Sequence, residues 1–164
     1  MRRRQKADTE AQEADERTVR TAALACLARR DYGEAELGER LRSRGYPAGL
    51  VATVVAALAA EKLLSDERFV EQFVAMHAAR GHGPVRVRAE LRERGVEAPA
   101  IEAALEQSPA DWIALARKAR QRKFGAAVPG DFRERAKQAR FLQYRGFSAE
   151  QIRAALGPGE DVDL

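Results

Sequence analysis

The stretch that decides the fold occurs three times in this chain. It is first Leu41-Arg42-Ser43-Arg44-Gly45-Tyr46, then Leu91-Arg92-Glu93-Arg94-Gly95-Val96, and finally Leu142-Gln143-Tyr144-Arg145-Gly146-Phe147, at offsets of 50 and 51 residues. The shared Leu-x-x-Arg-Gly-apolar signature is typical of a helix end, where glycine takes the left-handed conformation and apolar residues close the contact. Three copies at this spacing predict a repeat architecture.

The agreement between the copies continues on both sides of the signature. Apolar residues recur six and ten positions after each glycine, at Val51, Ile101, Ile152, Val55, Leu105 and Leu156. Four positions before the leading leucine the first two copies have Leu37 and Val87, whereas the third has Gln138 and so has diverged or carries an insertion. The residues expected to hold equivalent structural roles are Leu41, Gly45, Leu91, Gly95, Leu142 and Gly146.

Each copy is expected to contain three helices. Ser65-Asp66-Glu67 places a cap and two acids at a helix start, and Ser148-Ala149-Glu150-Gln151 has the capping-box pattern. We therefore predict an all-α protein with three-helix repeats at 21–64, 65–108 and 109–157, between a charged, partly disordered N-terminal tail (1–20) and a C-terminal tail (158–164). Because a unit of about 50 residues buries little surface alone, we expect the repeats to stack into an elongated, curved body.

The composition agrees with a helical protein. The chain has 33 Ala but only 18 Val, Ile and Thr residues together, and good helix formers are favoured over β-branched residues in helices. The longest mostly apolar run, 50–60, is too short to span a bilayer. The basic start, Arg2-Arg3-Arg4-Gln5-Lys6, has no apolar stretch behind it, so no secretory signal is expected. With a single cysteine, Cys26, we expect a cytoplasmic protein without disulfides.

Positive charge is concentrated towards the C-terminal third. The whole chain has a net charge of +4, whereas residues 111–145 alone carry 10 basic and 3 acidic side chains. A field of this kind attracts polyanions or an acidic protein surface and speeds their encounter. The alternative is an arginine-rich face that is simply exposed to solvent, because charge by itself does not define a function.

Several basic side chains are candidates for binding phosphate or carboxylate groups. Arg86 and Arg88 flank Val87, which the repeat places inward, so both are expected to point outward, with Arg80 upstream. The candidates in the two following helices are Arg117, Lys118, Arg122, Lys123, Arg133, Lys137 and Arg140, and Arg120 and Arg135 lie in the same runs. Positions 133, 137 and 140 share one helical face.

The residues that catalysis or metal binding would need do not form a recognisable pattern. There is no phosphate-binding loop motif, and His77 and His82 are the only histidines, so no zinc spacing can be built. Cys26 fits a small core residue better than a nucleophile. Tyr32 and His82 occupy equivalent positions before a glycine, which favours a structural role, and Trp112 is expected to pack at a helix start. We expect no enzymatic activity, no metal and no cofactor.

Together these features resemble the RecX family of recombinase regulators. The resemblance rests on the three signatures, on Ser65-Asp66-Glu67-Arg68-Phe69 at the start of the second repeat, and on the segment from Gly83 to Val96. It covers roughly residues 20–157, and the second repeat matches best, while the stretch 124–131 of the third repeat is harder to place.

The resemblance implies a bacterial regulatory protein that binds the RecA recombinase, chiefly as its filament on single-stranded DNA. Such a protein inhibits the ATPase activity of RecA, filament extension and strand exchange, and so modulates recombinational DNA repair and the SOS response. It is expected to be a monomer that can also contact DNA directly, without membrane association. The alternative hypothesis is a direct, non-sequence-specific nucleic-acid-binding helical protein, in which the basic helices at 117–140 neutralise phosphates without reading bases.

Overall fold

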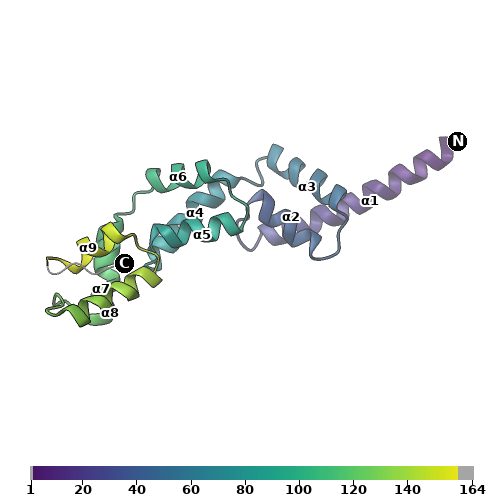
Figure 1. Ribbon diagram of the computed structural model, residues 1–164. Coiled ribbons are helices and arrows are strands. Elements are labelled where there is room, and N and C mark those ends of the chain that lie inside the picture. Colours follow the sequence, from purple (N-terminus) through teal and green to yellow (C-terminus); the bar gives the residue numbers. More distant parts are fainter. Residues whose placement is uncertain (1, 159–164) are drawn as a thin grey trace. The chain divides into compact units, whose positions relative to one another are not determined.

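The computed structural model describes residues 2–158, with side chains from residue 15 onward. Within this part of the chain the backbone forms nine α-helices and no strand, which confirms the predicted all-α class. Along the chain they are α1 (Arg2–Leu27), α2 (Glu34–Arg42), α3 (Ala48–Ala60), α4 (Asp66–Ala79), α5 (Pro84–Glu93), α6 (Ala98–Gln107), α7 (Trp112–Phe124), α8 (Phe132–Tyr144) and α9 (Ala149–Leu156) (Figure 1).

The structure describes most of the predicted N-terminal tail but little of the predicted C-terminal tail. Helix α1 runs across the boundary expected at residue 20, and Val19 is already buried in the core, so the first repeat begins before residue 21. The predicted C-terminal tail lies outside the described residues except for Pro158.

The described chain packs as two compact units, which do not coincide with the three repeats. Unit 1 contains the residues up to 69 together with 94–96, and unit 2 contains 70–93 and the residues from 97 onward. The division runs through the middle repeat, because the first turn of α4 and the turn after α5 pack with the first repeat.

The core of unit 1 lies between α1, α2 and α3, which all contact one another. Its buried side chains are Val19, Ala23, Cys26, Leu37, Leu41, Val51, Val54, Val55, Leu58 and Leu64. Cys26 therefore has the small-core-residue role expected from the sequence. Burying each leucine or valine removes apolar surface from water and contributes about 1.5–3 kcal/mol.

The repeated signature forms the helix end that the sequence predicts. Gly45, Gly95 and Gly146 have φ values of +90°, +79° and +86°, a conformation that glycine adopts without steric cost. After α2, the backbone N–H of Tyr46 donates to the carbonyl of Leu41 (3.4 Å), and the same bond recurs from Phe147 to Leu142 (3.2 Å). This is the Schellman pattern of a helix C-terminus. The leading residues Leu41, Leu91 and Leu142 are completely buried.

Helices of the third repeat begin at side-chain caps and enclose a second core. Asp111 accepts a hydrogen bond from the N–H of Ala114 (2.9 Å) at the start of α7, and Asp131 does the same for Glu134 (2.8 Å) at α8. Ser148 forms a full capping box with Gln151 at α9. Helices α7, α8 and α9 contact one another around Ala116, Ala139, Leu142, Phe147, Ile152, Ala155 and Leu156.

The third repeat departs from the other two because α8 is longer than α2 and α5, with 13 residues against 9 and 10. Its extra turn lies at the N-terminal end. Glu134 therefore occupies, inside a helix, the register position that Gly33 and Gly83 hold just before α2 and α5. Gln138 takes the place of Leu37 and is equally buried, bridging the Arg120 guanidinium (3.3 Å) and the Glu134 carboxylate (3.2 Å).

In unit 1, the turn after α5 packs closely on the start of α2. A Cβ atom added to Gly95 would lie 2.8 Å from the Cβ of Ala35, inside normal contact distance. The backbone N–H of Glu34 donates to the carboxylate of Asp66 (2.7 Å), which belongs to the first turn of α4. The signature turn of the second repeat is therefore fitted against the first repeat.

In unit 2, the turn after α8 packs in the same way on the start of α5. The N–H of Gly83 donates to the carbonyl of Arg145 (2.8 Å), and the N–H of Val85 donates to that of Gly146 (2.9 Å). A Cβ atom on Gly83 would lie 2.3 Å from the carbonyl oxygen of Gly146, and one on Gly146 would lie 2.3 Å from the Cβ of Arg86. We call this contact the Gly83–Gly146 joint.

Two arginines that the sequence analysis grouped with the basic surface are instead buried. Arg120 donates to the carbonyls of Ala126 and Ala127 (3.2 and 2.8 Å) in the loop after α7. Arg135 donates to the carbonyls of Leu156, Gly157 and Pro158, which have no helical partners at the end of α9. Both guanidinium groups have a structural role, because a buried charged group needs hydrogen-bond partners and these backbone carbonyls provide them.

None of the helices in the described part of the chain combines the length and the apolar character needed to cross a membrane.

Candidate functional site

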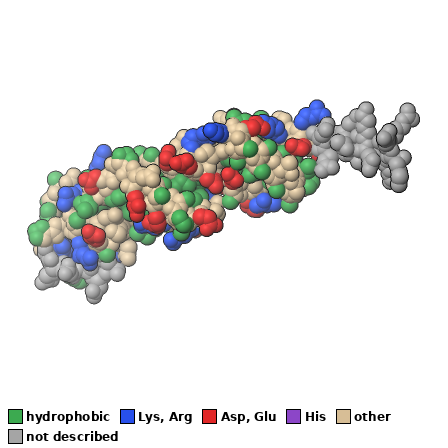
Figure 2. All heavy atoms as spheres, turned by 90° about the horizontal axis from the view of Figure 1, so that it is seen from above, with side chains coloured by type: hydrophobic (Ala, Val, Ile, Leu, Met, Phe, Trp, Pro, Cys, Tyr) green, Lys and Arg blue, Asp and Glu red, His purple; other side chains and the backbone are tan. Residues whose placement is uncertain are grey.

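The predicted binding residues differ in how much of their charge other groups in the chain neutralise. On the face shown in Figure 2, acidic and basic side chains are interspersed with apolar ones. Arg86 is paired with Glu90 (2.7 Å), and Arg88 makes a bidentate pair with Glu102 (2.8 Å). The hydrogen bonds from Arg88 lower the pKa of the Glu102 carboxyl group. Both arginines are half-buried and have much of their charge offset within unit 2.

The basic residues of α7 have a different environment. Lys118, Arg122 and Lys123 are exposed and line an open hollow of about 450 Å³ in unit 2. Arg80, at the end of α4, lines it as well, so the structure brings four of the predicted residues to one place. Arg117 is exposed too, but it faces α9, where its Nε donates to the carbonyl of Ala154 (3.3 Å).

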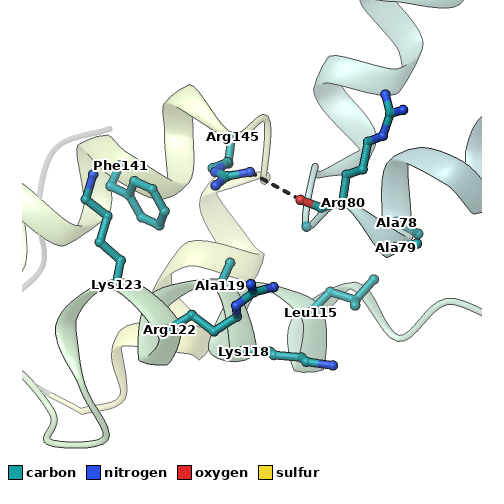
Figure 3. Close-up of a pocket in the computed structure, with 11 residues that line it drawn as sticks. Ala78, Ala79, Arg80, Leu115, Lys118, Ala119, Arg122, Lys123, Phe141 and Arg145 are labelled. Atoms are coloured by element: carbon teal, nitrogen blue, oxygen red, sulfur yellow. Dashed lines mark hydrogen bonds between the residues drawn. The ribbon is translucent and has the colours of Figure 1, made fainter.

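We call this feature the basic hollow. Of the described residues that line it, five are Arg or Lys and none is Asp or Glu. The basic members are Arg80, Lys118, Arg122, Lys123 and Arg145. Figure 3 shows Lys123 of α7 reaching toward Phe141 of α8, while the side chains of Lys118 and Arg80 extend away from Arg145. Like charges gathered without acids produce a positive potential that attracts anions.

Arg145 and Phe141, which line the basic hollow, were not among the predicted site residues. The Arg145 guanidinium donates to the carbonyl of Arg80 (3.2 Å) and lies 5.4 Å from the centre of the Phe141 ring. Lys123 approaches the same ring at 4.7 Å, and the edge of Phe124 packs against it. These cation–π contacts hold the basic side chains in place. Arg145 belongs to the repeated signature, so its sequence suggested only a structural role.

The basic residues of α8 form a stripe along that helix. Arg133, Lys137 and Arg140 are all exposed, as their helical spacing predicts, and the stripe continues to Tyr144, whose side chain is 82% exposed. The Lys137 ammonium lies 5.5 Å from the centre of the Phe124 ring. Phe124 thus lies between the basic side chains of α7 and those of α8.

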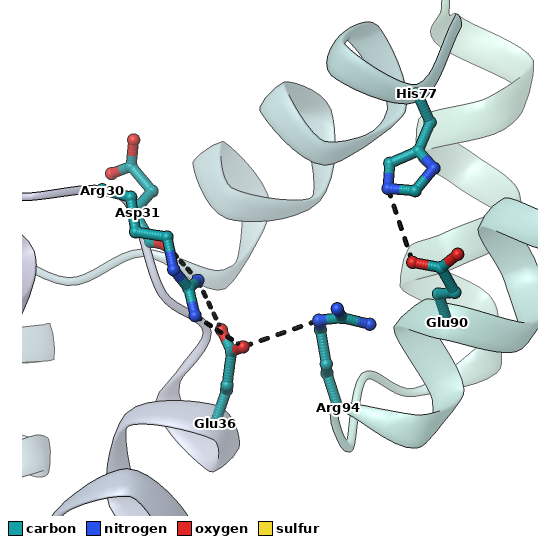
Figure 4. Close-up of polar contacts among 6 residues, drawn as sticks. All are labelled: Arg30, Asp31, Glu36, His77, Glu90 and Arg94. Atoms are coloured by element: carbon teal, nitrogen blue, oxygen red, sulfur yellow. Dashed lines mark hydrogen bonds and ion pairs between the residues drawn. The ribbon is translucent and has the colours of Figure 1, made fainter. Parts of the chain in front are cut away.

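The two histidines lie beside the Gly83–Gly146 joint. Nδ1 of His82 is 3.0 Å from Nδ1 of His77, and Nε2 of His77 is 3.5 Å from the carboxylate of Glu90 (Figure 4). Burial lowers the pKa of His82, and the positive charges of Arg86 and Arg145 lower it further. The short Nδ1–Nδ1 distance requires one ring to donate and the other to accept, so His82 has a structural role, as expected.

Tyr32 and Trp112, the other two aromatic candidates, also have structural surroundings. Tyr32 packs against the core of unit 1 with the Arg30 guanidinium 3.6 Å from its ring centre. Trp112 is half-buried in the first turn of α7.

The signature arginine of the second repeat makes a polar contact that resembles the one of Arg145. Within unit 1, Glu36 pairs with Arg30 (2.9 Å) and with Arg94 (3.5 Å), as Figure 4 shows. Arg94 and Arg145 therefore both contact the preceding repeat. Arg44, the equivalent residue of the first repeat, is exposed.

The fold and this surface define a helical-repeat protein with a basic hollow, and comparison with known proteins identifies its family. Three family models match in order: the first, second and third three-helix domains of RecX, at residues 20–58, 65–105 and 110–156. The chain belongs to the RecX family of regulatory proteins. This confirms the resemblance seen in the sequence.

The sequences of individual relatives align with this chain over most of their length. The regulatory protein RecX of Halorhodospira halophila is 50% identical over 145 residues, 88% of this chain and 90% of that protein. That of Ectopseudomonas mendocina is 47% identical over 134 residues, 82% of this chain and 89% of the relative.

Solved structures show the same fold at much lower identity. A crystal structure of a regulatory protein RecX matches with a TM-score of 0.76 at 21% identity, covering 90% of this chain and 74% of the other. That of RecX from Lactobacillus salivarius has a TM-score of 0.71 at 18% identity, covering 85% of this chain and 93% of the other.

Proposed function

We propose that this protein binds the RecA recombinase, chiefly as its filament on single-stranded DNA, and restrains ATP hydrolysis, filament extension and strand exchange. In this way it modulates recombinational DNA repair and the SOS response. The proposal is supported by membership of the RecX family of regulatory proteins, together with the partner that the sequence resemblance implies.

The observation that carries the proposal is the basic hollow. Some arginines elsewhere are paired within the chain, for example Arg20 with Glu61 and Arg88 with Glu102. The hollow instead brings together basic residues of α7, of the turn after α4 and of the turn after α8, and no acid is among the described residues that line it. Positive charge that the chain itself does not offset is available for an anionic partner, and a filament on DNA presents such groups.

Inhibition follows from preferential binding to one state of the filament. A partner that binds one conformation more tightly shifts the population towards it, by no more than the difference between the two affinities. If the favoured conformation is one in which RecA subunits neither hydrolyse ATP nor accept a further subunit, docking alone lowers both rates. The bound protein needs no chemistry of its own.

The direct experiment is a titration of RecA ATP hydrolysis on single-stranded DNA with this protein. We expect the rate to fall at substoichiometric amounts. An unchanged rate over the whole titration, with the protein folded, would overturn the proposal. Binding to naked single-stranded DNA, measured by fluorescence anisotropy, is the control for removal of the DNA substrate.

A charge-reversal variant tests the surface. Lys118→Glu, Arg122→Glu and Lys123→Glu together should weaken inhibition while leaving the protein folded and helical, since all three side chains are exposed. The matched control reverses three exposed arginines of unit 1, Arg29, Arg40 and Arg44, which gives the same change in net charge. Equal inhibition by the two triple variants would remove the basic hollow from the mechanism.

The α8 stripe supports direct nucleic-acid binding as a second candidate function. Arg133, Lys137 and Arg140 can neutralise phosphates, and the exposed Tyr144 ring can stack on a base. Under this hypothesis binding to naked single-stranded DNA is tight, falls steeply with salt and gains nothing from RecA. Tyr144→Ala should then weaken DNA binding, since stacking on one base contributes about 1–3 kcal/mol.

A further inference from the structure

A second depression adjoins the basic hollow and has the opposite character. It encloses about 440 Å³ and is lined largely by small apolar side chains of α4, α7 and the connection before α7. Its apolar lining includes Ala75, Pro109, Ala110, Ala114 and Leu115. We call it the alanine groove. Its one acidic residue, Asp111, already accepts the N–H of Ala114 as the cap of α7.

The two depressions are neighbours. Ala78, Ala79, Leu115 and Lys118 line both of them, so a ligand that extends past these four residues would contact both. The combined surface is basic at one end, around Arg122 and Arg145, and apolar at the other.

The side chains that line this surface favour an acidic polypeptide over single-stranded nucleic acid. Single-stranded nucleic acid is bound by basic side chains together with open aromatic faces on which bases stack. In the basic hollow the aromatic ring is that of Phe141, and it is already covered by Lys123, Arg145 and the edge of Phe124. The alanine groove provides no aromatic ring among its described lining residues.

A polypeptide fits both ends. Carboxylates pair with arginine and lysine, and aliphatic or aromatic side chains fill a groove whose own side chains are short. Ala75, Ala79 and Ala114 are exposed, so the apolar surface that such a ligand would bury is accessible. Apolar burial and charge pairing would then contribute together.

We propose that the basic hollow and the alanine groove form one docking site for a protein segment in which acidic residues lie next to apolar ones. This inference names the kind of partner segment and rests on the proposed function, in which the partner is a protein filament. Arg122 and Arg145 pair with the carboxylates, and the apolar side chains lie against Ala79 and Ala114.

The proposal is tested with defined probes and fluorescence anisotropy. The first is a fluorescein-labelled peptide, Glu-Glu-Asp-Glu-Ser-Leu-Phe-Leu-Leu, and the second replaces each of its apolar residues by serine. The third is a labelled oligothymidylate of about 15 nucleotides. We expect the first peptide to bind about tenfold or more tightly than the second. Binding of the oligothymidylate alone, or of neither peptide, would overturn the proposal.

Two variants separate the two ends of the site. Arg122→Glu should weaken both peptides about tenfold, whereas Ala114→Glu, which places a charge in the alanine groove, should weaken only the peptide with apolar residues. Ala103→Glu, at an exposed position on α6 away from the lining, is the matched control. If Ala103→Glu and Ala114→Glu weaken the apolar peptide equally, the groove is not part of the site.

The failure of this inference can be told apart from failure of the proposed function. If neither peptide binds but the unaltered protein still inhibits RecA ATP hydrolysis, the docking site is wrong and the function stands. If inhibition is absent in an otherwise folded protein, the proposed function itself fails.

Discussion

Replacing Gly83 by alanine should open the joint between α5 and the turn after α8. Gly83 is buried, and its added Cβ would lie 2.3 Å from the carbonyl oxygen and 2.4 Å from the carbonyl carbon of Gly146. These are backbone atoms, so no side-chain rotation relieves the overlap. The joint must move apart, which breaks the hydrogen bonds from Gly83 to Arg145 and from Val85 to Gly146.

The magnitude follows from these contacts. Each backbone hydrogen bond contributes about 1 kcal/mol net, and forcing a methyl group into a filled space costs about 1–3 kcal/mol. With two hydrogen bonds lost, we therefore expect Gly83→Ala to lower the free energy of unfolding by about 3–5 kcal/mol. For a chain of this size, each kcal/mol corresponds to about 2–4 °C in melting temperature.

The assay is urea unfolding followed by circular dichroism, with hydrogen exchange of the Gly83 and Val85 amides as a local measurement. The control is Gly49→Ala in α3, where an added Cβ meets nothing within 4 Å. Because alanine is more favourable than glycine in a helix, this control should raise the free energy of unfolding by about 0.5–1 kcal/mol. A Gly83→Ala protein as stable as the unaltered one, with both amides still protected, would refute the close approach.

Three further predictions concern other parts of the fold. Gly95→Ala should cost about 1–3 kcal/mol more than Gly45→Ala in urea unfolding, because both have positive φ but only Gly95 also has a side chain within 2.8 Å of the added Cβ; equal costs would contradict the packing described. Arg135→Met should lower the free energy of unfolding by about 2–4 kcal/mol, because carbonyls at the end of α9 lose their donor. Arg133→Met, at an exposed position, should change it by less than about 0.5 kcal/mol. The pKa of His82 lies below 6.5 in the folded protein, so the unfolded chain takes up the proton first and the free energy of unfolding should fall as pH drops below about 6.5. His82→Asn should flatten this dependence in urea titrations at about pH 7 and pH 5, and an unchanged slope would assign it to other groups.

The repeat signature could be read from sequence because its physical requirements are local. The signature consists of three residues at fixed spacing along one helix end. They are a leucine that must be buried, a glycine that must have positive φ and an apolar residue that follows it. Gly45, Gly95 and Gly146 therefore have the predicted conformation, and Leu41 and Leu91 are buried as expected. The caps at Asp131 and Ser148 are local in the same sense.

The roles of individual arginines could not be predicted in this way. Arg120 and Arg122 lie two residues apart in one basic run, yet the first is buried against loop carbonyls and the second is exposed. Arg88 is paired by Glu102 on the next helix, a contact that only tertiary packing determines. The long side chain of arginine can reach either solvent or a distant carbonyl, so its environment does not follow from its spacing alone.

The basic hollow could not be predicted either, because tertiary packing brings its residues together. Its parts come from the end of α4, from α7 and from the end of α8, and the sequence indicated the charge of α7 without its neighbours. Phe141 and Arg145 complete the hollow only because α8 packs beside α7. Arg145 in particular has two roles, since it binds the carbonyl of Arg80 and contributes charge.

At the register position of Gly33 and Gly83, the third repeat has Glu134 inside α8, and so it lacks the small residue that precedes α2 and α5. In the first two repeats, a helix start with little side-chain bulk receives the signature turn of the next repeat. The third repeat does not have a helix start of this kind. The middle repeat alone both accepts such a turn, at Gly83, and supplies one, at Gly95. Duplicating the middle repeat would therefore keep both kinds of contact in a longer engineered chain.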